Sequence, residues 1–492
     1  MARALILAAA VSLAIACGSS TVVAQPAPPP PTFASSGNTD FDAWRDDFAR
    51  RAVAAGRDPA VLGRLLNNVT PNPAIVDLDQ RQPEFVSPVW DYVTRGVSQR
   101  RIDDGRVLKA EIRALLAEVE NRYGVPNGII LGIWGLESNY GRADLPYDAA
   151  SALATLAFEG RRRAQFEGYL LALTEMVERG LADQQELRSS WAGALGQPQF
   201  MPDVYLTTAV DWDGDGHRDI WTNRADVAAS IGNYLQDRGW RRGEPVFDEV
   251  RLPDNFDYAL ADGTQRSVSD WEGRGVVRVD GAAWQASERN LMAQLFLPAG
   301  AQGPALLLHH NFGVIRRYNN SDRYALVVSL LARAFDGREG LVRRWPTQIG
   351  SLNREQTLEL QTLLTSLGYD PGPADGLFGS ATRRAVRAFQ TDQALPADGF
   401  PTTDLLQRVR ERAGVATEAP PAPVRTPRGL GRSGVRELQR LLNRLGYSAG
   451  RADGAIGART RAAIRAFERD RGMEVRGRAT DVVLEAARAA AN

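Results

Sequence analysis

The chain of 492 residues contains little cysteine, histidine or lysine. Its single cysteine, Cys17, excludes a disulfide within the chain. The three histidines, His217, His309 and His310, leave little material for a zinc centre or a serine–histidine–aspartate triad. Lys109 is the only lysine, which we attribute to genomic base composition rather than to recognition of polar ligands by arginine.

Net charge and long apolar runs are lacking as well. The 59 basic and 59 acidic side chains cancel, so the sequence predicts no bulk attraction to nucleic acid or to a membrane surface. Beyond the N-terminus no run reaches the roughly 18 apolar residues of a transmembrane helix. A hydrophobic content of 44% and a charged content of 24% are ordinary for globular protein. The length predicts roughly three domains.

Residues 1–24 have the pattern of a signal peptide. Arg3 supplies a positive charge, residues 4–16 form an apolar segment, and Val-Val-Ala at 22–24 is a cleavage site before Gln25. Cys17 follows Leu-Ala-Ile-Ala, which is similar to a bacterial lipobox except that Ala14 stands where leucine is usual. We expect a periplasmic protein, with an outer-membrane lipoprotein anchored at Cys17 as the alternative.

The remaining chain divides at proline-rich segments and at a repeat. Residues 25–38 are a Pro-rich linker, and residues 39–346 form the first large domain. Residues 352–412 and 432–490 are two copies of one module, joined by a second Pro-rich linker over 413–431. Residues pair at an offset of 78, as in Asp375/Asp453, Gly376/Gly454, Thr382/Thr460 and Phe389/Phe467. Each copy predicts a helix, a D-G-x-[FI]-G turn and a helix, with the threonine at or near the start of the second helix.

The large domain is predicted to be mainly helical. Helical spacing extends over Phe41–Ala55, Val107–Tyr123 and Ser151–Arg179. Between residues 245 and 310, short β-rich runs such as Gly275–Val279 and Leu306–His309 alternate with Gly and Asp turns. The fold class is therefore mainly α, with a small β-containing insertion.

One carboxylate, Glu137, stands at the end of an apolar helix predicted within Gly128–Arg142. Ile130, then Ile133 or Trp134, then Glu137 follow helical spacing, so Glu137 continues the face that we expect to be buried. Burial should raise its pKa and keep a proton available near neutral pH, as a general acid requires. From these residues alone, a solvated glutamate paired with Arg142 is an equally good interpretation.

Two longer motifs decide between these interpretations. GIWGLESNYGR at 132–142, followed by SWAGALGQPQFMP at 190–202, resembles the catalytic core of the lytic murein transglycosylases, in particular the membrane-bound lytic transglycosylase B family. The resemblance extends from Phe41 to Trp345 and implies a lysozyme-like helical domain. Both repeat copies resemble the peptidoglycan-binding domain of cell-wall enzymes, and a plain three-helix spacer is the alternative. We expect these modules to act as tethers that hold the enzyme at the wall.

The resemblance implies a reaction that needs one carboxylate and no cofactor. Glu137 would protonate the oxygen between N-acetylmuramic acid and N-acetylglucosamine, and would then take a proton from the muramic C6 hydroxyl as that oxygen attacks C1. The product is a 1,6-anhydromuramic end. Two rivals remain open: a hydrolytic muramidase that uses Asp144 or Asp148 to position water, and a non-catalytic wall-binding scaffold. The expected partners are peptidoglycan glycan strands and other cell-wall enzymes but not nucleic acid, and we expect a monomer.

Further site residues follow from the resemblance position by position. The substrate-binding candidates are Ser190, Gln199, Tyr318, Asn319, Tyr324, Tyr234, Tyr92, Arg162 and Arg163. Tyrosines offer stacking faces for sugar rings, and arginines reach carboxylates. Tyr234 and Tyr324 could equally be core aromatics. Gly196-Gln197-Pro198 departs from the family's Gly-x-Gly, and Pro198 lacks a backbone donor.

An Asp/Gly-rich loop follows at 211–226. Its predicted ligands for a structural Ca²⁺ are Asp211, Asp213, Asp215, the backbone carbonyl of His217, and Asp226. The spacing matches positions 1, 3 and 5 of an EF-hand loop with glycine at position 6. Position 12 is Thr222 rather than glutamate, so we expect weak binding. A plain Asp/Gly turn is the alternative.

Overall fold

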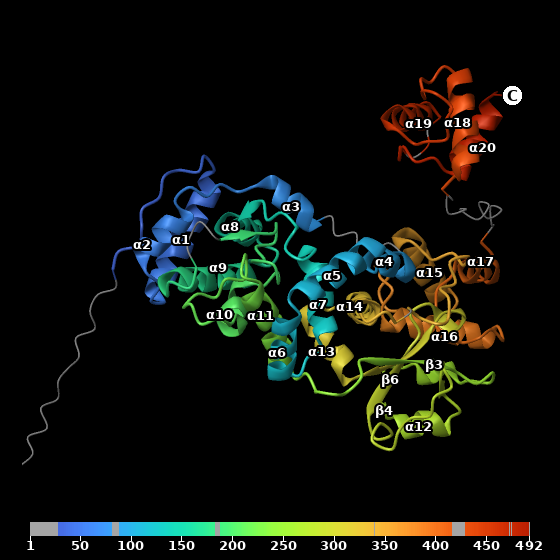
Figure 1. Cartoon of the computed structure of the whole chain (residues 1–492), viewed down its shortest axis with the longest axis horizontal. Coiled ribbons are helices and arrows are strands. Elements are labelled where there is room, and N and C mark those ends of the chain that lie inside the picture. The colour runs from blue at the N-terminus through green and yellow to red at the C-terminus, as the bar shows by residue number, and fades with distance from the viewer. Residues whose placement is uncertain are drawn as a thin grey trace, which may run out of the picture. The chain divides into compact units, whose positions relative to one another are not determined.

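The computed structural model describes residues 28–80, 88–182, 187–338, 340–415, 429–471, 473 and 475–491. Its contacts divide the chain into two compact units, Met1–Thr402 and Thr403–Asn492 (Figure 1). The predicted signal peptide, Cys17 and most of the predicted linker over 413–431 lie outside the described residues. Within the described ranges, none of the helices has the length and apolar character needed to cross a membrane.

The first unit begins with helices. They are α1 (Thr39–Ala54), α2 (Pro59–Leu66), α3 (Pro73–Gln80), α4 (Val89–Gly96), α5 (Gln99–Glu111), α6 (Arg113–Tyr123) and α7 (Asn127–Ser138). The prediction of one continuous helix over Val107–Tyr123 is wrong, because the helix is interrupted at Ile112, which ends α5 and precedes α6. The described part of the predicted Pro-rich linker packs on α1: Phe33 lies against the main core, and the Arg45 guanidinium stands 4.6 Å from its ring centre.

A second set of helices follows. They are α8 (Ala149–Glu159), α9 (Arg163–Glu178), α10 (Pro202–Thr208) and α11 (Arg224–Asp237), and β1 (Tyr147–Asp148) pairs with β2 (Arg188–Ser189). The single helix predicted over Ser151–Arg179 is also wrong. Gly160 adopts a φ of +99°, a left-handed conformation that ends α8, and α9 begins three residues later.

The predicted β-containing insertion is confirmed. Its elements are β3 (Phe247–Arg251), η3 (Tyr258–Leu260), β4 (Arg266–Ser267), α12 (Val268–Gly273), β5 (Val277–Arg278), β6 (Met292–Phe296), η4 (Gly300–Gln302) and β7 (Ala305–His309). The strands form an antiparallel sheet in the order β4-β6-β7-β3-β5. Leu306 and Leu308 of β7 enter the main core, whereas Leu307 enters a small second core with Trp271 and Trp284. The sheet is thus covered on both faces.

Two helices complete the large domain, and one of them packs closely on α7. They are α13 (His310–Tyr318) and α14 (Asp322–Phe335). A Cβ added to Gly128 would lie 3.1 Å from Ala332, and one added to Gly132 would lie 2.8 Å from the carbonyl oxygen of Val328. The glycines therefore let the two backbones approach closely. Because the pairing is antiparallel, it brings the C-terminal end of α7 to the N-terminal end of α14.

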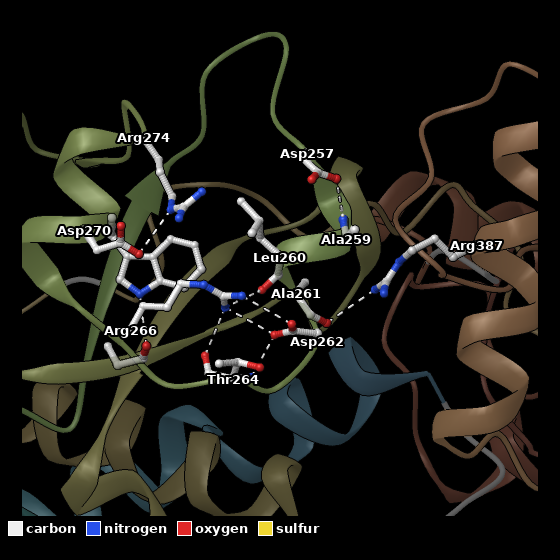
Figure 2. A network of polar contacts seen from close by, with 12 residues as sticks. Asp257, Ala259, Leu260, Ala261, Asp262, Thr264, Arg266, Asp270, Arg274 and Arg387 are labelled. Atoms are coloured by element: carbon white, nitrogen blue, oxygen red, sulfur yellow. Dashed lines mark hydrogen bonds and ion pairs between the residues drawn. The ribbon is translucent and has the colours of Figure 1, made fainter.

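Part of the first repeat copy docks on this domain. Helices α15 (Arg354–Ser366) and α16 (Ser380–Asp392) belong to the first unit. The Asp398 carboxylate accepts the Ala301 backbone N–H at 2.7 Å, and Arg387 donates to the Ala261 carbonyl oxygen at 3.3 Å. Figure 2 shows Arg387 reaching the loop in which Arg266 is paired with Asp262. Residues 353–402 are therefore packed on the large domain.

The second unit contains α17 (Thr403–Arg412), α18 (Arg432–Arg444), α19 (Ala458–Asp470) and α20 (Asp481–Ala491). The two copies share one buried hydrogen-bond network at the offset of 78. Gln361 donates to Asp375, to the Leu377 carbonyl and to Thr382, just as Gln439 donates to Asp453, to the Ala455 carbonyl and to Thr460. The threonines lie near the start of the second helix, as predicted, but Gly379 and Gly457 occupy the caps.

Candidate active site

Glu137 lies in the last turn of α7, where it meets a buried tyrosine of α14. The Tyr324 hydroxyl donates a hydrogen bond to Glu137 Oε1 at 2.6 Å, and Tyr324 is 2% exposed. Burial, together with the nearby Glu137, raises the pKa of Tyr324 well above its usual value. The hydroxyl is therefore a permanent donor that orients the carboxylate.

Tyrosines predicted from three separate segments gather beside Glu137. The Tyr318 ring stacks on that of Tyr324 with centroids 6.4 Å apart, and its centroid lies 4.7 Å from that of Tyr234. Burial and then Glu137 raise the pKa of Tyr318 well above its usual value. Tyr92 on α4 belongs to the same cluster, since it is close enough to Tyr324 to contribute to the raised pKa of that residue. The four tyrosines that the resemblance suggests as substrate contacts thus lie together. Tyr234 and Tyr324, which could equally be core aromatics, are buried.

The loop from Ser190 to Phe200 is held by its own hydrogen bonds and contacts the tyrosine cluster. The Ser190 hydroxyl accepts the Ala194 N–H at 3.2 Å, and Gln199, at a φ of +56°, donates to the Gly196 carbonyl at 2.8 Å. Pro198 contributes its carbonyl oxygen, which accepts the Tyr318 hydroxyl at 2.6 Å. The missing donor at Pro198 therefore does not prevent a contact with the tyrosine cluster.

Sequence reasoning missed Gln197 as a member of this arrangement. Its side chain accepts the Trp134 indole N–H at 2.7 Å and donates to the Trp221 carbonyl at 2.6 Å. Gln197 thereby joins α7 to the loop and to the segment before α11. The sequence did offer one signal for Gln197, because it occupies the middle position of the family's Gly-x-Gly within the second motif.

Three predicted site residues show other contacts. Arg162 forms an ion pair with Asp79, and Arg163 donates to the carbonyl oxygens of Ala157 and Phe158. Asn319 is exposed, and its backbone carbonyl accepts the Ser321 N–H at 2.6 Å. These contacts do not link the three residues to the tyrosine cluster, and their substrate roles stay predictions.

Two charged side chains near Glu137 in the sequence, Arg142 and Asp148, make contacts with residues other than Glu137. Arg142, the alternative partner of Glu137, is paired with Asp104. Asp148 accepts the Ser151 N–H at 2.8 Å and caps α8, and Asp144 is exposed. A capping carboxylate is held by the helix that it begins, which makes Asp148 a poor means of positioning water.

The Asp/Gly loop brings three carboxylates together. Oxygens of Asp211, Asp213 and Asp226 all lie within 4.8 Å of one another. The pKa of Asp226 is raised to about 6. Burial is the largest cause and the neighbouring Asp213 and Asp211 add to it, while the backbone N–H groups of Trp212 and Asp219 act in the opposite direction. Asp215 is not in this cluster, and its carboxylate accepts the His217 N–H at 2.8 Å. Three convergent carboxylates fit a hard cation such as Ca²⁺.

Family models match most of the chain. The transglycosylase SLT domain model matches residues 40–333, and the peptidoglycan binding domain model matches residues 353–409 and 431–486. The chain is 32% identical over 280 residues to membrane-bound lytic murein transglycosylase B of Escherichia coli K12, covering 55% of this chain and 73% of that protein.

Solved structures give the same relationship. SltB3 of Pseudomonas aeruginosa, in complex with NAG-anhNAM-pentapeptide, superposes with a TM-score of 0.73 at 43% identity, covering 76% of this chain and all of that one (100%). The Escherichia coli lytic transglycosylase Slt35, in complex with calcium, gives a TM-score of 0.51 at 28% identity, covering 62% of this chain and 95% of that one.

Proposed function

This chain belongs to the transglycosylase SLT domain family, and we propose that it is a peptidoglycan lytic transglycosylase. It cleaves the β-1,4 bond between N-acetylmuramic acid and N-acetylglucosamine without water and leaves 1,6-anhydromuramic ends. The hydrogen bond from Tyr324 to Glu137 carries the proposal, because it holds one carboxylate at the end of an apolar helix and beside a cluster of tyrosines.

The reaction uses Glu137 twice. It first gives its proton to the glycosidic oxygen as the C1–O bond breaks. The C6 oxygen of the same muramic residue then bonds to C1, and its proton passes to Glu137, which is restored for the next cycle. An attacking group within the same sugar has the high effective concentration of intramolecular reactions. Tyr324 orients Glu137 through both steps.

Two observations favour this reaction over hydrolysis. Asp148 serves as a helix cap, so it is a poor candidate for positioning water. SltB3, which is 43% identical, was solved with an anhydro-sugar ligand. We extend that ligand chemistry to this chain.

The replacement Glu137→Gln tests the proposal. The amide fills the same volume but cannot donate a proton, so release of anhydromuropeptides should fall by at least about 100-fold. Mass spectrometry of digested sacculi measures the products, and Asp144→Asn serves as the matched control that should retain activity. Reducing ends in place of anhydro ends, or a Glu137→Gln protein within a few-fold of wild type, would refute the mechanism.

The remaining parts of the proposal concern binding and location. We propose residues 39–346 as the catalytic domain and residues 352–412 and 432–490 as peptidoglycan-binding modules. Ser190, Gln199, Asn319 and the half-buried Tyr92 and Tyr318 contact the glycan, and Ca²⁺ at Asp211, Asp213 and Asp226 supports the fold. Export by residues 1–24 brings the enzyme to the periplasm, and lipidation of Cys17 would hold it at the outer membrane.

A further inference from the structure

The two repeat copies share a backbone but differ in charge. The first copy, residues 351–413, has seven arginines and eight carboxylates, a formal charge of −1. The second copy, residues 429–491, has thirteen arginines and seven carboxylates, a formal charge of +6. Both copies come from one gene, so its base composition cannot explain why only the second copy is basic.

The common backbone allows a comparison position by position. Helices α15 and α18, and then α16 and α19, begin and end 78 residues apart. The bridge between Ser351 and Thr402 recurs between Gly429 and Thr480 at the same offset. On this alignment, nine of the thirteen arginines of the second copy stand where the first copy has a non-basic residue.

The added arginines lie on the surface of the module. All thirteen are described by the structure, and all are exposed. Arg432, Arg436, Arg440 and Arg444 follow one another at four-residue spacing along α18, where the first copy has one arginine followed by Leu, Thr and Ser. Like charges at this spacing destabilise a helix by about 0.2–0.5 kcal/mol per pair. Because the attraction of Arg440 to Glu437 offsets only part of this repulsion, the run of arginines does little for the module's own stability, which points to a partner outside it.

The positions at which the two copies differ include those that dock the first copy on the large domain. Asp398 accepts the Ala301 N–H, and Phe400 packs against the main core of the first unit. The corresponding residues of the second copy are Arg476 and Arg478, both exposed. The second copy thus carries two cations in place of the carboxylate and the ring used for docking.

We propose that the second copy binds the carboxylates of peptidoglycan peptide stems through its exposed arginines. The first copy, whose residues 353–402 pack on the large domain, does not depend on charge in this way. The guanidinium group presents two parallel donors that match a carboxylate, which suits arginine to this partner. The proposal rests on peptidoglycan being the substrate, and the second copy itself matches the peptidoglycan binding domain family over residues 431–486.

Residue exchange between the copies tests the proposal in the full-length protein. One variant gives three positions of the second copy the residues of the first: Arg440→Thr, Arg444→Ser and Arg469→Thr. The matched control removes three exposed arginines of the first copy in favour of the residues of the second: Arg384→Ala, Arg408→Ala and Arg412→Ala. A third variant, with lysine at positions 440, 444 and 469, keeps the charge but removes the paired donors.

Co-sedimentation with purified sacculi is measured from about 50 to about 500 mM NaCl, a range over which exposed ion pairs become screened. Each exposed ion pair between an arginine and a carboxylate of the wall contributes about 0.2–1 kcal/mol. The first variant loses three of them, so it should bind sacculi about tenfold more weakly at low salt, and its binding should depend less on salt. The control should stay within about twofold of wild type, and the lysine variant should fall between the two.

Two further arms identify the anionic group. Sacculi whose carboxylates have been converted to amides should lose the salt-dependent part of binding, whereas phosphatidylglycerol vesicles should bind wild type no better than they bind the variant. Unchanged sedimentation of the first variant, indifference to amidation, or preferred binding to the vesicles would overturn the proposal. Release of anhydro products from short soluble strands is measured separately, so a failure of the proposed reaction is seen independently of these binding results.

Discussion

Replacing Tyr324 with phenylalanine isolates the hydroxyl that donates to Glu137, the proposed catalytic carboxylate. The ring stays in its buried place against Tyr318, while the 2.6 Å hydrogen bond to Glu137 is lost. A hydrogen bond to a charged group contributes about 1.5–3 kcal/mol. Because this bond favours the ionised carboxylate, its loss makes Glu137 hold its proton more tightly.

The assay is the pH dependence of kcat/KM for anhydromuropeptide release from soluble strands. The alkaline limb reports loss of the proton from the general acid, so it should move to higher pH when the hydrogen bond to Glu137 is removed. Tyr318→Phe is the matched control, since its hydroxyl donates to the Pro198 carbonyl rather than to Glu137. Superimposable profiles for wild type and Tyr324→Phe would refute the orienting role of the hydroxyl.

Three other predictions test the supporting structure. Calcium should raise the melting temperature, and the rise should be larger at pH 7.5 than at pH 5, because protons compete with calcium for Asp226, whose pKa is about 6. The double replacement Asp211→Ala with Asp213→Ala should abolish the rise, whereas Asp215→Ala should largely keep it. Gly132→Ala should lower the free energy of unfolding by about 1–3 kcal/mol and reduce activity, whereas Gly168→Ala, with open space around it on α9, should do neither. A chain ending at residue 415 should keep its melting temperature and its turnover of soluble strands, whereas one ending at residue 350 loses the docking contact of Asp398 and should melt earlier. Equal melting temperatures for the two truncated chains would contradict the docking of the first copy.

The parts of the fold that could be predicted depend on local pattern. The apolar spacing before Glu137 predicted α7, and the alternation of strands and turns predicted the insertion. The 78-residue repeat predicted two copies, whose hydrogen bonds the structure repeats almost atom for atom. In each case the information lies within one segment of the chain.

The parts that could not be predicted depend on contacts between distant residues. No glycine or proline marks the break at Ile112. Gly160 could have been noticed, but a glycine within a helical pattern often causes no break. Nothing in the sequence indicates the ion pair between Arg162 and Asp79, which lie 83 positions apart. The docking of the first copy depends on Asp398 meeting a backbone N–H 97 residues earlier.

The bond between Glu137 and Tyr324 also bears on when the enzyme can become active. The two residues are 187 positions apart, and the packing of α7 on α14 is what brings them together. A chain emerging from the ribosome, or from a membrane translocon, therefore carries the complete catalytic helix long before it carries the hydroxyl that orients the carboxylate. Nascent chains shorter than about two-thirds of the protein should be unable to cut the wall, so the topology itself delays activity until the catalytic domain has been completed.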